Sequence, residues 1–279
     1  MKGALDDAAW LEVLESTAEL IEAAVRPLFG TEAGRREIGR GAGGDRTVEL
    51  DRVAEEVALS RLQAVAEPAA GASVLSEEAG LVDLGAEWPR ILVDPVDGSL
   101  NAKRGLPVVG TMLTLLRGPT VGDAAAAHVR NLVSGEGWSV VRGGGLRRNG
   151  RLITPMRTGP PRRFEVLALE SGPRHVLAAR PLIERASKIR LFGSMALSLA
   201  HTAAGGVDVH FSGMAGRVFD MSAGALMLAE VGGVATDGEG RQLAQLAADL
   251  RTRTTLLASA WPELHALALD ALRADAAEG

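Results

Sequence analysis

The sequence predicts a globular protein of mixed structure, with an α+β first half and an α/β second half. Three observations lead to this prediction. Apolar residues recur at helical spacing near the N-terminus, short apolar runs and tight turns follow up to about residue 160, and strands then alternate with helices. Of the 279 residues, 47% are hydrophobic and 23% charged, which is enough to bury a large core. We expect two halves, 1–160 and 161–279, packed as one unit.

The first half contains two expected helices, 6–28 and 51–66, separated by a Gly- and Arg-rich loop at 34–46. Asp6 or Asp7 can cap the first helix, and Gly30 follows its end. Short buried strands are expected at 74–75, 91–93 and 108–116, followed by a hairpin over 126–141 that turns at 134–137, a connection at 143–145 and a tight turn at Asn149-Gly150.

The second half is expected to alternate between strands and helices. Strands are predicted at 164–169, 189–192, 207–211, near 234 and at 254–258. Helices are predicted at 176–186, 194–203, 220–230 and from 262 onward.

Composition excludes several classes of function. There are 30 basic and 35 acidic residues, a formal charge of −5, which argues against a broadly basic nucleic-acid surface. The absence of cysteine excludes disulfides, zinc thiolate sites and a cysteine nucleophile. The N-terminus has acids where a signal peptide would be apolar, and no apolar run of about 18 residues occurs. We expect a cytoplasmic protein without membrane or nucleic-acid partners.

The segment from Ile91 to Asn101, ILVDPVDGSLN, is the most informative for chemistry. An apolar strand leads into Asp94, and one turn can bring Asp97 beside it. Two carboxylates this close favour a divalent cation such as Mg²⁺ between them. Gly98 and Ser99 then open a helical turn whose free N–H groups suit a phosphate. A solvent-exposed Asx-type turn is the plainer alternative.

Other acids stand at the edges of predicted elements. Glu77 and Glu78 follow a short apolar run, and Asp51 and Asp220 each precede an apolar helix. A simple N-cap explains Asp51 or Asp220 taken alone. The acids at these element edges match a metal site better as a group than any one of them does alone, although the sequence does not show that they converge.

Four motifs stand out in the sequence: DPVDGSLN at 94–101, SEE at 76–78, GSMALSLAHTAAGGVD at 193–208 and FDMSAGALMLAEVGG at 219–233. They resemble motifs of the inositol monophosphatase family, whose members are Mg²⁺-dependent, Li⁺-sensitive phosphomonoesterases. Segments 39–56 and 101–108 resemble most closely the archaeal-type enzymes that act on fructose 1,6-bisphosphate and inositol phosphates. The resemblance implies a layered α-β-α-β-α sandwich of the sugar phosphatase type and a homodimer. Its substrate would be a small phosphorylated metabolite.

The resemblance also implies roles for individual residues. Two or three Mg²⁺ per site would be bound by Glu77, Asp94, the Val96 carbonyl, Asp97 and Asp220. Catalysis would use Glu77 and Ser99 to orient and deprotonate a water, supported by Asp51. Substrate would contact Asp97, Gly98, Ser99, Gly193, Ser194, Met195 and Asp220.

Departures from the family pattern bear on the substrate. Gly43 stands where the archaeal-type loop has an Asp, with Asp45 nearby as a replacement, and 210–219 lacks the Glu that inositol-preferring members use. Arg190 and Arg217 could instead bind a second phosphate or a carboxylate. Phosphatases for 3′-phosphoadenosine 5′-phosphate, NADP or histidinol phosphate remain alternatives.

Other classes of function have weaker support. Segment 39–44 matches G-x-G-x-x-G but lacks the strand before it and the helix after it. There is no G-x-S-x-G elbow, and the five histidines lack metal-ligand spacing. A non-catalytic regulatory module of the same fold is the alternative from a different class, but such a module should have lost metal ligands.

Overall fold

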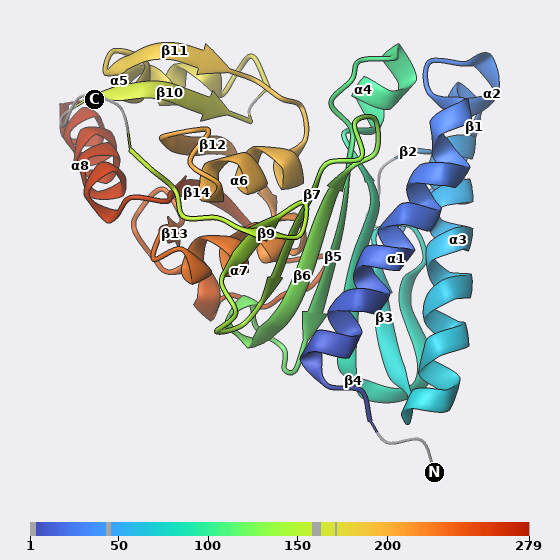
Figure 1. The fold of residues 1–279 in the computed structure, drawn as a ribbon. Helices are drawn as coiled ribbons and strands as arrows, with labels where there is room; N and C mark the ends of the chain where they lie inside the picture. Colours follow the sequence, from blue (N-terminus) through green and yellow to red (C-terminus); the bar gives the residue numbers. More distant parts are fainter. Residues whose placement is uncertain (1–3, 43–45, 158–162, 171, 279) are drawn as a thin grey trace.

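The chain folds into five layers in the order helix, sheet, helix, sheet, helix (Figure 1). The computed structural model describes residues 4–42, 46–157, 163–170 and 172–278. This arrangement confirms the expected α-β-α-β-α sandwich. No helix in these ranges combines the length and apolar character needed to cross a membrane.

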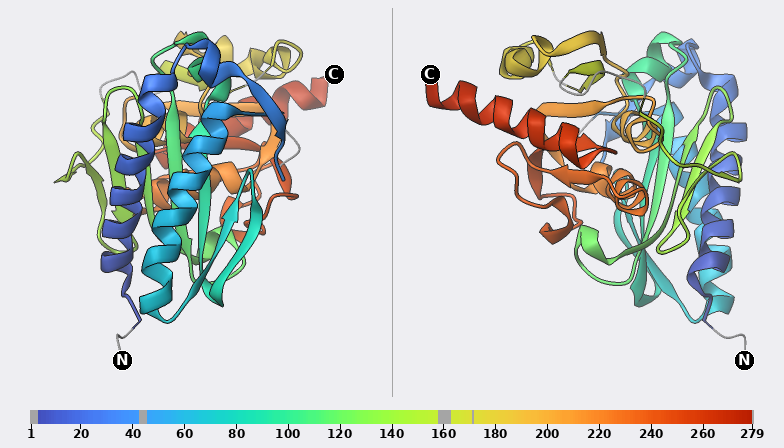
Figure 2. Two further views of the ribbon diagram at one scale, coloured as in Figure 1. Left: turned by 90° about the vertical axis from the view of Figure 1, so that its right-hand side faces the viewer. Right: turned by 60° about the vertical axis from the view of Figure 1, so that its left-hand side comes forward.

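The first layer consists of two long helices, α1 (Asp7–Val25) and α3 (Glu49–Ala66), which run side by side along the first sheet (Figure 2). The Asp6 carboxylate caps α1 by accepting a hydrogen bond from the Ala9 N–H. Shorter elements surround them: η1 (Arg26–Leu28), α2 (Glu32–Arg35), the antiparallel pair β1 (Glu37–Arg40) and β2 (Arg46–Val48), and η2 (Glu67–Ala69).

The first sheet has seven strands in the order β3-β4-β5-β6-β7-β8-β9. Their bounds are β3 (Ala72–Ser76), β4 (Gly80–Asp97), β5 (Gly110–Leu116), β6 (Ala124–Asn131), β7 (Gly137–Val141), β8 (Leu146–Arg148) and β9 (Arg151–Leu152). Between them lie α4 (Ser99–Arg104) and η3 (Val121–Asp123).

Strand β4 has two arms, one on each side of β3. The register between these arms and β3 sets the positions of the acids that follow. Ser76 pairs with Gly80 on one side and with Val93 on the other. The residue after Ser76 therefore lies beside the residue after Val93. The sequence did not predict the first arm of β4, because only the second arm, 91–93, is a continuous buried apolar run.

The second sheet has five strands in the order β11-β10-β12-β14-β13. They are β10 (Phe164–Leu169), β11 (Ala186–Arg190), β12 (Val209–Arg217), β13 (Val234–Thr236) and β14 (Arg253–Ser259). The helices are α5 (Arg180–Ile183), α6 (Met195–Ala203), α7 (Ser222–Glu230) and α8 (Pro262–Glu278), with short turns η4 (Val176–Ala179), η5 (Phe219–Met221) and η6 (Leu243–Gln245).

Helices α6 and α7 form the central layer, and α5 and α8 cover the far face of the second sheet (Figure 1). Side chains of β4 alternate between its two faces. Ile91 and Val93 pack with the core under α1 and α3, whereas Leu92 packs with the core around α6 and α7. By the same alternation, Asp94 faces the central layer.

Most predicted elements are confirmed, including the hairpin of β6 and β7 and the turn at Asn149-Gly150, where φ is +50° and +75°. The prediction of a loop at 34–46 is wrong in part, because α2, β1 and β2 form there; Gly43 and Asp45 lie outside the described residues. The helix predicted at 176–186 is also wrong in part. The segment forms a 3₁₀ turn, η4, and then the short helix α5, which starts at Arg180 with Pro181 in its first turn, and β11 already starts at Ala186.

Two buried histidines make the stability of the fold sensitive to acid. Burial lowers the pKa of both His128 and His210 to about 3. His128 Nδ1 lies 2.9 Å from Ser139 Oγ, whereas neither ring nitrogen of His210 has a hydrogen-bond partner within the described parts of the chain. The unfolded chain takes up these protons below about pH 6.5, so the stabilising contribution is complete above that pH and is lost as pH falls towards 3.

We therefore expect His210→Leu to reduce acid sensitivity. Each pH unit below about 6.5 costs the wild type about 1.4 kcal/mol for His210 alone, and the variant avoids this cost. Urea unfolding between pH 8 and pH 5 measures the free energy of unfolding of both proteins. The value for the variant minus that for the wild type should increase as pH falls. A difference that is independent of pH would contradict this explanation.

Candidate active site

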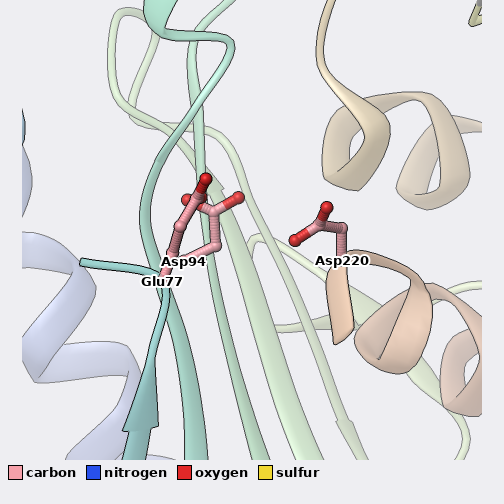
Figure 3. A group of neighbouring side chains, drawn as sticks. All are labelled: Glu77, Asp94 and Asp220. Atoms are coloured by element: carbon pink, nitrogen blue, oxygen red, sulfur yellow. The ribbon is translucent and has the colours of Figure 1, made fainter. Parts of the chain in front are cut away.

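Three carboxylates converge at the border between the first sheet and the central layer (Figure 3). Glu77 follows β3, Asp94 belongs to β4 and Asp220 lies in η5, just before α7. One oxygen from each side chain lies within 4.8 Å of the other two. In Figure 3 Glu77 and Asp94 stand together, and Asp220 faces them from the opposite side.

The register of the first sheet explains why Glu77 and Asp94 lie together. The Glu77 N–H donates to the Val93 carbonyl at 3.3 Å, which fixes the chain immediately after β3 against β4. The Val96 N–H donates to Asp94 Oδ1 at 3.2 Å, and the Asp94 side chain is buried. Asp220 was predicted as a possible helix N-cap, but it lies inside a 3₁₀ turn, with Met221 preceding α7.

The three carboxylates are electrostatically unfavourable without a cation. Burial raises the pKa of Asp94 well above its ordinary value, and neighbouring carboxylates, Glu77 first, raise it further. Burial also raises the pKa of Asp220, to about 7, against the opposing effect of Arg217. Buried oxygen ligands of like charge fit a hard divalent cation. Asp220 Oδ1 is buried and has no hydrogen-bond partner among the described residues, so one ligand atom is available.

Asp97 is held differently from these three acids. It accepts hydrogen bonds from Ser194 Oγ at 2.5 Å and from the Ala196 N–H at 2.6 Å, at the start of α6. Burial raises its pKa, and these hydrogen bonds act in the opposite direction. The carboxylate thus joins the first sheet to the central layer, next to the cluster.

Asp51 and Ser99 lie close to each other and to the Val96 carbonyl. Asp51 is the third residue of α3 rather than its N-cap, and its Oδ2 accepts the Val48 N–H at 3.0 Å. Ser99 Oγ lies 3.2 Å from Asp51 Oδ1 and 3.0 Å from the Val96 carbonyl oxygen. Because burial raises the pKa of Asp51, this carboxylate is suited to exchange a proton with a neighbouring hydroxyl.

A cavity of about 380 Å³ lies beside these groups, and its lining includes Glu77 and Asp94 of the cluster but not Asp220. Its lining consists of Asp51, Glu77, Glu78, Asp94, Val96, Asp97, Gly98, Ser99, Leu100, Lys103 and Arg217. Hollows of about 570 and 490 Å³ elsewhere on the protein are larger, but their described linings do not include the three-carboxylate cluster. We therefore place the candidate site by its chemistry rather than by its volume.

The predicted substrate segment from Gly193 to Met195 does not line this cavity in the described structure. The Gly193 N–H donates to Glu170 Oε1 at 3.0 Å, and the Ser194 hydroxyl donates to Asp97. These donors are therefore already engaged. Arg190, a predicted anion-binding residue, is exposed on β11, and its Nη1 donates to the neighbouring Ile189 carbonyl.

Three residues of the site received no role in the sequence prediction, and one of the four described next, Arg217, was predicted only to bind a second phosphate or a carboxylate. Lys103 lies one helical turn after Ser99, a spacing that could have placed it on the same face of α4. Burial raises the pKa of Glu78 to about 7, and Thr47 donates a hydrogen bond to it. Arg217 contacts the cluster directly, with Nη2 2.5 Å from Glu77 Oε1 and Nε 3.0 Å from Asp220 Oδ2.

The fourth residue, Glu170, braces the segment that precedes α6. It accepts the Phe192 N–H at 3.1 Å, the Gly193 N–H at 3.0 Å and the Ser198 hydroxyl at 2.6 Å. From the opposite side, Asn101 Nδ2 donates to the Phe192 carbonyl at 2.7 Å. No pattern in the sequence distinguishes Glu170 from an ordinary acid at the end of a strand.

Comparison with known proteins identifies the family and the fold. A model of the inositol monophosphatase family matches residues 6–276. The fructose-1,6-bisphosphatase/inositol-1-monophosphatase of Thermococcus kodakarensis is 30% identical, over 95% of this chain and 97% of the relative. The protein of the same name from Methanothermobacter thermautotrophicus is 32% identical, over 92% and 94%. A crystal structure of an inositol monophosphatase-fructose 1,6-bisphosphatase superposes with a TM-score of 0.81 at 24% identity, covering 94% of this chain and 99% of that one.

Removal of the Glu170 carboxylate should destabilise the protein. Glu170→Ala leaves the buried Ser198 hydroxyl and the half-buried Phe192 N–H without their acceptor, which costs about 1–3 kcal/mol of unfolding free energy. Glu170→Gln keeps one acceptor oxygen and should lose less. Glu165, exposed on β10, the strand that Glu170 follows, provides the control, since Glu165→Ala should change stability by less than about 0.5 kcal/mol. Equal effects at positions 170 and 165 in urea unfolding would refute the bracing role.

Proposed function

The chain belongs to the inositol monophosphatase family and is a phosphoric monoester hydrolase, and we propose that it is a Mg²⁺-dependent enzyme for a small sugar or cyclitol phosphate. Fructose 1,6-bisphosphate and inositol monophosphate are the candidate substrates. The observation that carries this proposal is the convergence of Glu77, Asp94 and Asp220 beside the start of α4. Halves 1–160 and 161–279 act as one catalytic unit, because each supplies part of this cluster.

The residues of the cluster fit a binuclear or trinuclear Mg²⁺ site. Glu77, Asp94, the Val96 carbonyl, Asp97 and Asp220 would hold the ions, with Asp94 shared. Mg²⁺ supplies positive charge that activates water and neutralises the phosphate and the leaving oxygen.

The remaining groups act on water and phosphate. Glu77 accepts a proton from the attacking water, while Ser99 orients that water and Asp51 Oδ1, 3.2 Å from Ser99 Oγ, holds the hydroxyl. The Gly98 and Ser99 N–H groups bind phosphate oxygens. The segment 193–195 lies outside the cavity lining, so it would contact a bound substrate only at the edge of the cavity and through groups other than the Gly193 N–H and the Ser194 hydroxyl, which are engaged.

Two basic side chains favour a substrate with a second anionic group. Lys103 and Arg217 line the cavity together with its five carboxylates, which the bound cations would offset. In addition, residues 210–219 contain no acid to accept hydrogen bonds from ring hydroxyls of inositol. We therefore rank fructose 1,6-bisphosphate above inositol monophosphate. Lithium sensitivity, a homodimer and a cytoplasmic location complete the proposal and rest on family membership.

A phosphate-release panel tests this function. Fructose 1,6-bisphosphate, inositol 1-phosphate, 3′-phosphoadenosine 5′-phosphate, NADP and histidinol phosphate are each assayed with and without Mg²⁺, and with Li⁺. We expect Mg²⁺-dependent release that Li⁺ inhibits. Asp94→Asn should lower the rate about 10³-fold, about 4 kcal/mol in activation free energy, with unchanged circular dichroism. No release from any compound, or a variant that keeps most of its rate, would refute the proposal.

Lys103 tests the substrate ranking. Lys103→Gln removes a cation from the cavity, so KM for fructose 1,6-bisphosphate should rise about tenfold, while KM for inositol 1-phosphate changes little. Lys188→Gln, at an exposed position of β11, is the matched control. An equal rise in KM for both substrates would show that Lys103 does not recognise a second phosphate.

A further inference from the structure

Arg217 places a positive charge of the protein directly against the acidic cluster. The Arg217 side chain is only 11% exposed, and its guanidinium bridges Glu77 and Asp220. Burial alone would lower the pKa of Arg217, but the surrounding carboxylates outweigh it and raise the pKa above the ordinary value. Arg217 is thus a buried counter-ion of the carboxylates that would bind a divalent cation.

The contacts of Arg217 with Asp220 and with Glu77 differ in whether they use an oxygen that a bound cation would need. Its Nε contact uses Asp220 Oδ2 at 3.0 Å and leaves Oδ1, which is buried and without a hydrogen-bond partner in the described residues. Its Nη2 contact uses Glu77 Oε1 at 2.5 Å, within the group of oxygens that converge. A divalent cation among these oxygens would be repelled by a guanidinium held so close to Glu77.

We propose that Arg217 is the exchangeable counter-ion of the cluster. It pairs with Glu77 and Asp220 when no divalent cation is bound, and it releases Glu77 when a divalent cation binds. Because Arg217 also lines the cavity, the released edge of its guanidinium is then available to the substrate phosphate. The inference rests on the divalent-cation site of the proposed function.

The geometry provides a pivot for this exchange. Arg217 and Asp220 are three residues apart, at the end of β12 and in η5, so the contact between Nε and Oδ2 is local. A planar guanidinium can keep that contact through one edge while another nitrogen changes partner. A lysine side chain has a single ammonium group, so it cannot keep the Asp220 contact with one nitrogen while another nitrogen changes partner.

The first test measures binding of divalent cations without substrate. Isothermal titration with Mg²⁺ and Mn²⁺ should show about tenfold tighter binding to Arg217→Gln than to the wild type, because a competing positive charge is absent. The metal-free variant should melt about 3 °C lower, since the cluster has lost its counter-ion. Arg217→Lys should lie between the two proteins, and Arg190→Gln, an exposed arginine of β11, should match the wild type. Unchanged or weaker binding to a folded Arg217→Gln overturns the proposal.

The second test uses inorganic phosphate in the presence of Mg²⁺. Arg217→Gln should bind it about tenfold more weakly than the wild type, although it binds Mg²⁺ more tightly. These opposite changes distinguish exchange from a purely structural role, which would weaken both. Phosphate affinity equal to that of the wild type overturns the second half of the proposal.

A measurement on the wild type makes the proposal independent of variant folding. In protein labelled with ¹⁵N-arginine, addition of Mg²⁺ should shift the Nε–H resonance of Arg217, assigned by its loss in Arg217→Lys. No shift at saturating Mg²⁺ overturns the exchange. If the wild type binds neither Mg²⁺ nor Mn²⁺, the proposed function fails as well; if it binds them with Arg217 unaffected, only this inference fails.

Discussion

Electrostatic repulsion between buried carboxylates is the constraint on which the rest of this structure depends. Glu77, Asp94 and Asp220 place three like charges within 4.8 Å, in a region where burial already raises the pKa of Asp94 and Asp220. An unpaired charge there costs far more than at the surface, so the protein must supply protons, a guanidinium or bound cations. The fold resists separation of the acids because Asp94 and Asp220 lie within elements packed in the core and Glu77 directly follows one.

The rigidity of the site follows from how the two sheets share the central layer. Strand register fixes Glu77 beside Asp94, and the turn η5, just before α7, presents Asp220 to them. Asp97 ties the first sheet to α6, while Asn101 and Glu170 hold the preceding segment from opposite sides. Movement of one half relative to the other would break these hydrogen bonds, of which those of Asp97 and Asn101 are partly buried. The same contacts that join the halves therefore also set the distances within the site.

Sequence patterns predicted the parts of the site that depend on local structure. An apolar strand that runs into Asp94, and a glycine before the short helix at Ser99, are local features with recognisable chemistry, and family resemblance added Glu77 and Asp220. Contacts between distant segments could not be predicted in this way. The ion pair between Arg217 and Glu77 joins residues 140 positions apart. The hydrogen bond from the Gly193 N–H to Glu170 depends on neighbouring strands of the second sheet. The first arm of β4 was missed because its apolar residues are half-buried or, at Leu81, exposed, and do not form the continuous apolar run of a core strand.

The identity of the positive charge at the cluster determines what the site can do. A guanidinium tethered to the backbone neutralises acids but offers no vacant coordination position for water or phosphate, whereas a divalent cation offers several. Arg217 is attached three residues before Asp220, so it cannot leave the site and competes with every incoming cation at a fixed local concentration. Such a competitor discriminates by charge: a monovalent cation gains little over the guanidinium it would displace, while a divalent cation gains about twice the Coulomb attraction at the same distance. Tethered arginine and clustered carboxylates together therefore favour divalent over monovalent cations without any requirement for a rigid cage of a particular size.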